Sequence, residues 1–193
     1  MRHARLTAAL LVGHMACSLS PSFAASEAHP PAQPQAPFAV VEATIADIHA
    51  AMRANTLTCR ALVDAYLARI AAYDKRGPVL NAIVVVNPSA RALAEELDRR
   101  FVASGPIGPL HCIPTIVKDN FETIGMQSAA GSRSMAGFTS ERDAISVARI
   151  KAAGAIVLAK SNMAEFAFSP YETLSSLHGQ TRNPYALDRA PAG

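Results

Sequence analysis

Three short apolar runs that alternate with helical segments constrain the fold of this chain most strongly. Each run is continuously apolar, which is typical of strands that are covered on both faces of a sheet. Apolar residues at helical spacing separate the runs, first from Pro88 to just before Gly105 and again over residues 143–153. The order strand, helix, strand predicts an α/β fold. The three runs cover residues 82–86, 112–117 and 155–159.

Two further helices are predicted upstream of the first run. Thr44 with Asp47 three residues later is the pattern of a capping box, and it predicts a short helix that ends near Arg53. Thr58 is placed to cap a second helix, which ends before Gly77. This second helix carries one apolar stripe, so we expect it to pack on another layer. The stripe consists of Leu62, Tyr66, Ile70 and Tyr73.

The first 24 residues have the three parts of a secretory signal. Arg2 and Arg5 form a basic start, residues 6–16 are apolar, and Ser22-Phe23-Ala24 is a small-x-small cleavage site. An apolar stretch of 11 residues is shorter than the roughly 20 that span a bilayer. We therefore expect cleavage, a mature protein in the periplasm or outside the cell, and no stable membrane span.

A proline-rich tether follows the signal. Residues 25–37 contain four prolines, which remove backbone donors and favour an extended, solvated segment. The folded domain is expected to begin near Phe38 and to run to Gly193. A chain of 193 residues of which 50% are apolar is long enough to bury one core, and no second domain boundary is evident.

Charge and composition argue against nucleic-acid binding. Loss of Arg2 and Arg5 with the signal reduces the 18 basic residues to 16, against 15 acidic ones. The chain has no Trp and no basic stripe with interleaved aromatic residues. We therefore expect no nucleic-acid partner. The oligomeric state is left open.

Cysteine and histidine usage does not predict a metal site or a disulfide framework. Cys17 leaves with the signal, so the mature chain keeps Cys59 and Cys112. These two could pair in an oxidising compartment, but the prediction is two separate buried thiols. The sequence has no Cys-x-x-Cys and no close pair of histidines outside the apolar signal stretch, so no metal is expected.

Lys118 is the candidate catalytic residue that its position in the sequence suggests. It ends the second apolar run, where burial would disfavour the ammonium form and allow a neutral lysine to act as a base. Without further context, a lysine at a strand end is an ordinary solvated charge. No Gly-x-Ser-x-Gly elbow is present. The serines after Lys118 are read as loop hydrogen-bonders: Ser128, Ser132 and Ser134.

The sequence resembles the amidase signature family at three ordered places. The resemblance extends from Thr44 to Gly193, so no single short motif carries it. It implies an amidase signature fold with a mixed central sheet flanked by helices, incomplete in this chain. The three places are Gly-Pro-Leu-His-Cys-Ile-Pro-Thr-Ile-Val-Lys-Asp-Asn (108–120), Ala-Gly-Ala-Ile-Val-Leu-Ala-Lys-Ser-Asn-Met-Ala-Glu-Phe (153–166) and Gly-Gln-Thr-Arg-Asn-Pro-Tyr-Ala-Leu-Asp-Arg-Ala-Pro-Ala-Gly (179–193).

The resemblance implies a role for Lys118. Members of the family hydrolyse amides with a catalytic triad of a nucleophilic serine, a serine with a cis peptide bond, and a strand-end lysine, which Lys118 matches. Both serines belong to a Gly/Ser-rich stretch that follows Arg-x-Pro-x-Gly, and this chain stops at that motif, at residues 189–193. We therefore expect a full-length amide hydrolase without a cofactor, and a 193-residue chain that is inactive by itself.

Other residues receive supporting roles from the same resemblance. Asp119 and Asn120 are expected to orient the lysine strand and its loop, and Lys160 is expected to be structural. Ala167 aligns near the substrate channel of fatty acid amide hydrolase-like members, with a plain core alanine as the alternative.

Two alternatives to an exported amidase stay open. One is the amidase subunit of a cytosolic tRNA-dependent amidotransferase, which the signal segment disfavours and which works with a partner subunit. The other is a non-catalytic truncated remnant. Residues 179–189 resemble bacterial peptide amidases, which makes C-terminal peptide amides the first substrate to test, with fatty and aryl amides still open.

Overall fold

The computed structural model describes residues 38–169 and 171–191. The signal and tether predicted for residues 1–37 lie outside the described residues and stay predictions. Within the described ranges, no helix is both long enough and apolar enough to cross a membrane. The main helices are α1 (Ile45–Arg53), α2 (Cys59–Tyr73), α3 (Ala90–Ser104) and α4 (Ile145–Ala152). The strands are β1 (Ile83–Val86), β2 (Pro114–Lys118), β3 (Ile156–Ser161), β4 (Leu174–Ser175) and β5 (Gly179–Gln180).

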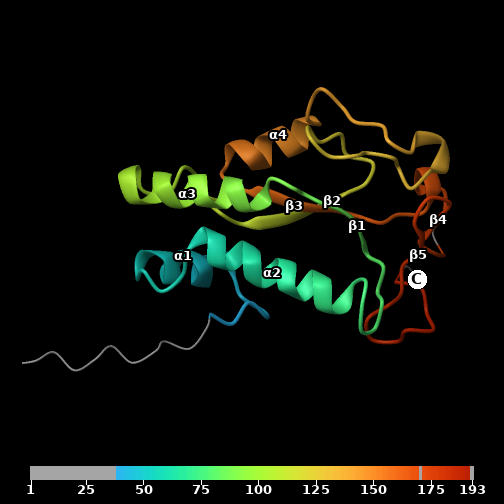
Figure 1. The fold of residues 1–193 in the computed structure, drawn as a ribbon, viewed down its shortest axis with the longest axis horizontal. Helices are drawn as coiled ribbons and strands as arrows, with labels where there is room; N and C mark the ends of the chain where they lie inside the picture. Colours follow the sequence, from blue (N-terminus) through green and yellow to red (C-terminus); the bar gives the residue numbers. More distant parts are fainter. Residues whose placement is uncertain (1–37, 170, 192–193) are drawn as a thin grey trace, which may run out of the picture. The chain divides into compact units, whose positions relative to one another are not determined.

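A mixed three-stranded sheet of order β1-β3-β2 forms the centre of the fold (Figure 1). β3 lies in the middle, antiparallel to β1 and parallel to β2. The strands correspond to the three apolar runs of the sequence, so the predicted α/β architecture is confirmed. The parallel register aligns Lys118, the last residue of β2, with Ser161 at the end of β3.

The sheet has an apolar layer on each face. Ile156 and Leu158 of β3 pack with buried residues of α1, α2 and α3 on one face. Val117 of β2 and Val157 of β3 pack with Val147 of α4 on the other. Figure 1 shows α4 on the side of the sheet opposite α1 and α2. Coverage of both faces explains why the central strand β3 is continuously apolar in sequence.

The two N-terminal helices begin where their caps predict. Thr44 and Asp47 form a complete capping box at the start of α1. The Thr58 hydroxyl accepts the backbone N–H of Ala61 at 3.1 Å and caps α2. Gly154 closes α4 as predicted, with a φ of 99°. A Cβ at Gly154 would lie 2.7 Å from the Cα of His111, so the approach of the two segments also requires glycine.

Helices α3 and α4 each begin two residues later than predicted. Asn87 lies before the N-cap residue Ser89. Its side-chain oxygen accepts the N–H of Ser89 at 2.9 Å, and its side-chain amide donates to the carbonyl of Val157 at 2.7 Å. Asp143 is likewise outside α4. Its carboxylate accepts the N–H of Ile124 at 2.8 Å and pairs with Lys151 at 2.8 Å. In both cases a long-range contact uses the side chain that the sequence assigns to the helix start.

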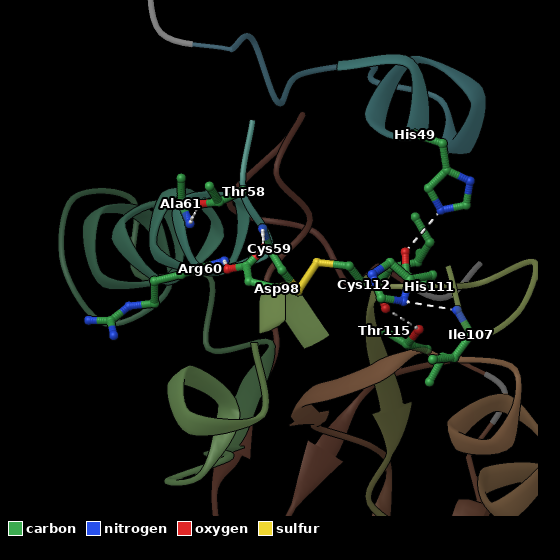
Figure 2. Close-up of a disulfide and its surroundings, with 11 residues drawn as sticks. His49, Thr58, Cys59, Arg60, Ala61, Asp98, Ile107, His111, Cys112 and Thr115 are labelled. Carbon is green, nitrogen blue, oxygen red and sulfur yellow. Dashed lines mark hydrogen bonds between the residues drawn. A yellow bond between two sulfur atoms is a disulfide. The ribbon is translucent and has the colours of Figure 1, made fainter. Parts of the chain in front are cut away.

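Cys59 and Cys112 form a disulfide, so the prediction of two separate thiols is wrong (Figure 2). Both residues are fully buried, and their Cα atoms lie 5.5 Å apart across 53 residues of sequence. Burial was predicted, but the pairing depends on how α2 meets the segment before β2. That meeting point is a tertiary feature with no local sequence signal.

Hydrogen bonds from three elements surround this disulfide (Figure 2). The Asp98 carboxylate of α3 accepts the backbone N–H of Cys59 at 2.6 Å and that of Arg60 at 3.0 Å, at the start of α2. His49 of α1 donates through Nε2 to the carbonyl of His111 at 2.9 Å. The N–H of Cys112 donates to the carbonyl of Gly154 at 2.8 Å. The cross-link therefore sits where α1, α2 and α3 meet the entry to β2.

Candidate active site

Lys118 lies at the C-terminal end of β2 and is exposed. β2 is an edge of the three-stranded sheet, so within residues 38–169 and 171–191 no strand lies on its outer side. The burial predicted for Lys118 is therefore wrong for the part of the chain that the structure describes. The prediction assumed a strand covered on all sides, whereas β2 is covered only where α4 and β3 contact it.

The exposed face of β2 adjoins a groove. Ile116 and Lys118 alternate with Val117, which is buried against α4, so both belong to the opposite face of the strand. Ile116 is 47% exposed and lines a groove of about 550 Å³ together with Tyr66 and Tyr73 of α2. The candidate base thus stands two residues from an open, largely apolar surface.

Asp119, directly after Lys118, is fully buried and anchors the loop that follows. Its carboxylate accepts the backbone N–H of Ala129 at 3.3 Å and that of Gly131 at 3.0 Å. Its own N–H donates to the carbonyl of Ser161 at the end of β3, at 3.1 Å. These contacts fix the loop after β2, and the orienting role of Asp119 toward Lys118 stays a prediction. Asn120 is exposed, and its role stays a prediction.

Lys160 is the buried lysine at this end of the sheet. It lies opposite Val117 in the β2–β3 register and is 0% exposed. Its ammonium donates to the carbonyl of Phe121 at 2.6 Å and to the Ser128 hydroxyl at 2.9 Å. Desolvation by burial lowers the pKa of Lys160 to about 8, while the charge of Asp119 acts in the opposite direction.

Ser128, Ser132 and Ser134 are loop hydrogen-bonders, as predicted. The Ser128 hydroxyl donates to the carbonyl of Phe121 at 3.1 Å. The Ser132 hydroxyl contacts the Ser134 hydroxyl at 2.8 Å and donates to the Glu165 carboxylate. The Ser132 hydrogen bond is the main cause that holds the pKa of Glu165 below its usual value. These hydroxyls are thus committed to holding the loop.

Ala167 lies in a short 3-10 helix, Glu165–Ala167, and is exposed. The alternative of a plain core alanine is therefore wrong. Its φ of 59° and the 49° of Phe166 place both in the left-handed region, so the chain turns sharply here. A role of Ala167 in a substrate channel stays a prediction. In the described segments, no group of three or more His, Cys, Asp or Glu side chains is placed to hold a metal.

The comparison with protein families decides the classification. The family model described as Amidase matches residues 61–193, which is more than half of the chain and includes Lys118. The chain belongs to the amidase signature family. The match begins within α2 and covers both strands that frame the candidate site.

Solved amidases and curated relatives agree with this membership. The peptide amidase of Stenotrophomonas maltophilia is 42% identical with a TM-score of 0.74, over 79% of this chain and 32% of that one. A bacterial aryl acylamidase of the amidase signature family is 26% identical with a TM-score of 0.70, over 78% and 31%. One glutamyl-tRNA(Gln) amidotransferase subunit, from Alkalilimnicola ehrlichii, is 42% identical over 154 residues, which are 79% of this chain and 31% of that protein. The chain thus spans about a third of the length of these relatives.

The family resemblance predicts Lys118 and Asp119 as site residues, and it does not reveal two features of the described structure: the burial of Lys160 and the Cys59–Cys112 cross-link. The expectation that Lys160 is structural agrees with its burial and its hydrogen bond to the loop after Lys118, but the sequence does not indicate that it is buried. Lys118 and Lys160 both end an apolar run, so the sequence pattern does not distinguish them; Lys160 is buried because β3 is the central strand. The Cys59–Cys112 cross-link was the second omission.

Proposed function

We propose that this amidase-family protein hydrolyses carbon–nitrogen amide bonds with Lys118 as the general base of a Ser–cisSer–Lys triad. The observation that carries the proposal is the place of Lys118. It stands at the exposed end of β2 and is followed by a loop whose position is fixed by a buried carboxylate. A base presented from a rigid strand end can be aligned with a serine brought to the open side of the strand.

The proposed reaction uses neutral Lys118 to remove a proton, through the cis serine, from the nucleophilic serine. The nucleophile attacks the amide carbonyl, and backbone N–H groups stabilise the oxyanion. The tetrahedral intermediate then expels the amine, which takes up the proton. Water hydrolyses the acyl-enzyme with the same lysine as base. We assign both serines to the Gly/Ser-rich stretch that follows Arg-x-Pro-x-Gly in relatives.

The exposure of Lys118 fits this assignment. A catalytic base must be neutral, which requires that its ammonium form be desolvated or repelled. A serine-bearing segment packed on the open side of β2 would supply the desolvation. In this proposal, the lysine becomes a base only when that segment is in place.

We further propose that the protein works outside the cytoplasm. The Cys59–Cys112 disulfide supports export, because disulfides persist in oxidising compartments and are rare in the cytosol. The signal-like residues 1–24 support it independently. The alternative, an amidase component of a cytosolic amidotransferase complex, is favoured by the 42% identity to the glutamyl-tRNA(Gln) amidotransferase subunit of Alkalilimnicola ehrlichii. A reduced, cytosolic protein in complex with other subunits would support that alternative.

Peptide amides are the first substrate class to test. The peptide amidase of Stenotrophomonas maltophilia shares 42% of aligned residues with this chain, whereas the aryl acylamidase shares 26%. The full-length product of the gene should be assayed with a C-terminal peptide amide, a fatty amide and an aryl amide in parallel. The proposal expects the highest kcat/KM on the peptide amide.

A chimera tests the role of Lys118 directly. The part of this chain that aligns with the Stenotrophomonas maltophilia peptide amidase, 79% of its residues, replaces the matching 32% of that enzyme, and the rest of that enzyme supplies the serines. Lys118→Ala should lower kcat by about 10²–10⁴-fold, the range typical of a lost general base. Lys75→Ala is the matched control, because the Lys75 side chain is 54% exposed and lies outside the site. Parent activity in a folded Lys118→Ala chimera would refute the proposal.

A further inference from the structure

The burial of Lys160 requires a physical reason. An ammonium group moved out of water loses several kcal/mol of hydration unless partners replace it. Lys160 is 0% exposed, and its two hydrogen-bond partners, the Phe121 carbonyl and the Ser128 hydroxyl, both belong to the loop after β2. Methionine or leucine would fill the same apolar run without this desolvation. The lysine is therefore placed to hold the loop rather than to fill the core.

Lys160 and Asp119 hold the same loop from two strands. Asp119 follows β2 and binds the N–H groups of Ala129 and Gly131 near the end of the loop. Lys160 belongs to β3 and binds Phe121 and Ser128. Both ends of the segment from Phe121 to Gly131 are thus fixed to the sheet. This segment begins three residues after Lys118.

We propose that Lys160 is a positioning residue for Lys118. It fastens the loop 121–131 to the central strand, and the loop in turn fixes the end of β2 from which Lys118 projects. The inference rests on the proposed role of Lys118 as base. β2 has a strand on one side only, so its end depends on the loop contacts for a defined position. Loss of those contacts would move the base relative to its serine, and a displacement near 1 Å can cost about 10²-fold in rate.

The first test uses the 193-residue chain. Lys160→Met keeps the length and apolar stem of the side chain but cannot donate to Phe121 or Ser128. Amide hydrogen exchange at Ala129 and Gly131 should accelerate by about 10-fold or more, since these N–H groups depend on the loop position. Lys75→Met, at an exposed lysine, should leave both rates unchanged. Unchanged exchange in folded Lys160→Met would overturn the proposed tie to the loop.

The second test measures catalysis in the chimera, with active sites counted by a serine-reactive phosphonate so that misfolded protein is not included. Lys160→Met should lower kcat per active site by about 10-fold or more with KM within about 2-fold, because the base is displaced while substrate contacts remain. An unchanged kcat per site would overturn the inference. If Lys160→Met does not fold, Ser128→Ala removes only the hydrogen bond between Lys160 and Ser128. It should likewise accelerate amide exchange at Ala129 and Gly131 and lower kcat per active site. If Ser128→Ala then leaves both the hydrogen-exchange rates and kcat per active site unchanged, the proposal is contradicted.

The two proposals fail in different ways. If Lys118→Ala keeps full activity, the assignment of the base is wrong, whatever the loop does. If Lys118→Ala is inactive and Lys160→Met retains parent kcat, the base is correct and only the positioning role is refuted.

Discussion

Cys59 at the start of α2 and Cys112 just before β2 are joined by a disulfide across 53 residues of sequence. The bond closes a loop that contains α2, β1 and α3, so it connects the helical layer to the strand that ends at Lys118. A cross-link over a loop of this length restricts the unfolded chain strongly.

Removal of this disulfide should destabilise the fold. In the chain-entropy model, closure of a 53-residue loop contributes about 4 kcal/mol to the free energy of unfolding. Urea unfolding of the oxidised chain and of the Cys59→Ser, Cys112→Ser double variant should differ by about 2–4 kcal/mol. The double variant should show the same midpoint with and without reductant. Equal stability of the oxidised chain and the double variant would contradict the structural role of the bond.

The redox state of the cysteines should follow the compartment. In thiol trapping of cell fractions, Cys59 and Cys112 of the exported form should not react with the alkylating reagent, because they are joined in a disulfide. Thiol oxidoreductases of the oxidising compartment form this bond after export. A variant that lacks residues 1–24 should stay in the cytoplasm with both thiols free. Recovery of the natural protein from the cytoplasm in reduced form would contradict export and favour the amidotransferase alternative.

Asp119 should be sensitive to a nearly isosteric change. Asp119→Asn replaces one of two acceptor oxygens by an amide NH₂ that faces a backbone N–H, either of Ala129 or of Gly131. An unsatisfied buried polar group costs about 1–3 kcal/mol, so the free energy of unfolding should fall by this amount. Asp188→Asn, at an exposed site, should stay within about 0.5 kcal/mol. Equal effects of the two substitutions would indicate that the Asp119 contacts do not stabilise the loop.

Lys160 should make stability depend on pH in the alkaline range. Its folded-state pKa is lowered from the ordinary 10.5 to about 8, so between these values the unfolded chain binds more protons than the folded one. The free energy of unfolding contributed by this group therefore rises as pH increases from about 8 to about 10.5. The rise should be on the order of 2–4 kcal/mol. The difference between the parent and Lys160→Met, measured by urea unfolding at several pH values, isolates this contribution. Parallel pH curves would show that Lys160 titrates normally.

The sequence predicts which helices and strands form better than it predicts the residue at which each helix begins. The capping residues Thr44 and Thr58 act locally, so the starts of α1 and α2 follow from the sequence. The starts of α3 and α4 are misplaced because Asn87 and Asp143 use their side chains on distant backbone or side-chain groups. Local patterns carry no information on such contacts.

The candidate site divides in the same way. The predictions that Lys118 is the base and that Asp119 orients its loop come from motif resemblance, which reflects local sequence. The exposure of Lys118 could not be predicted, because it depends on β2 being an edge strand in the described sheet. The pairing of Cys59 with Cys112 likewise depends on how α2 packs against the entry to β2.

Chemical rescue of the Lys118→Ala chimera is the most direct test of the central claim. The hydrolysis rate of a peptide amide is measured with increasing ethylamine, which can enter the space left by the lysine side chain and act as a free base. The account predicts a low rate that rises with the concentration of unprotonated amine and therefore with pH, while Lys75→Ala gives the parent rate without amine. A Lys118→Ala chimera that hydrolyses the amide at the parent rate without any added amine would contradict it.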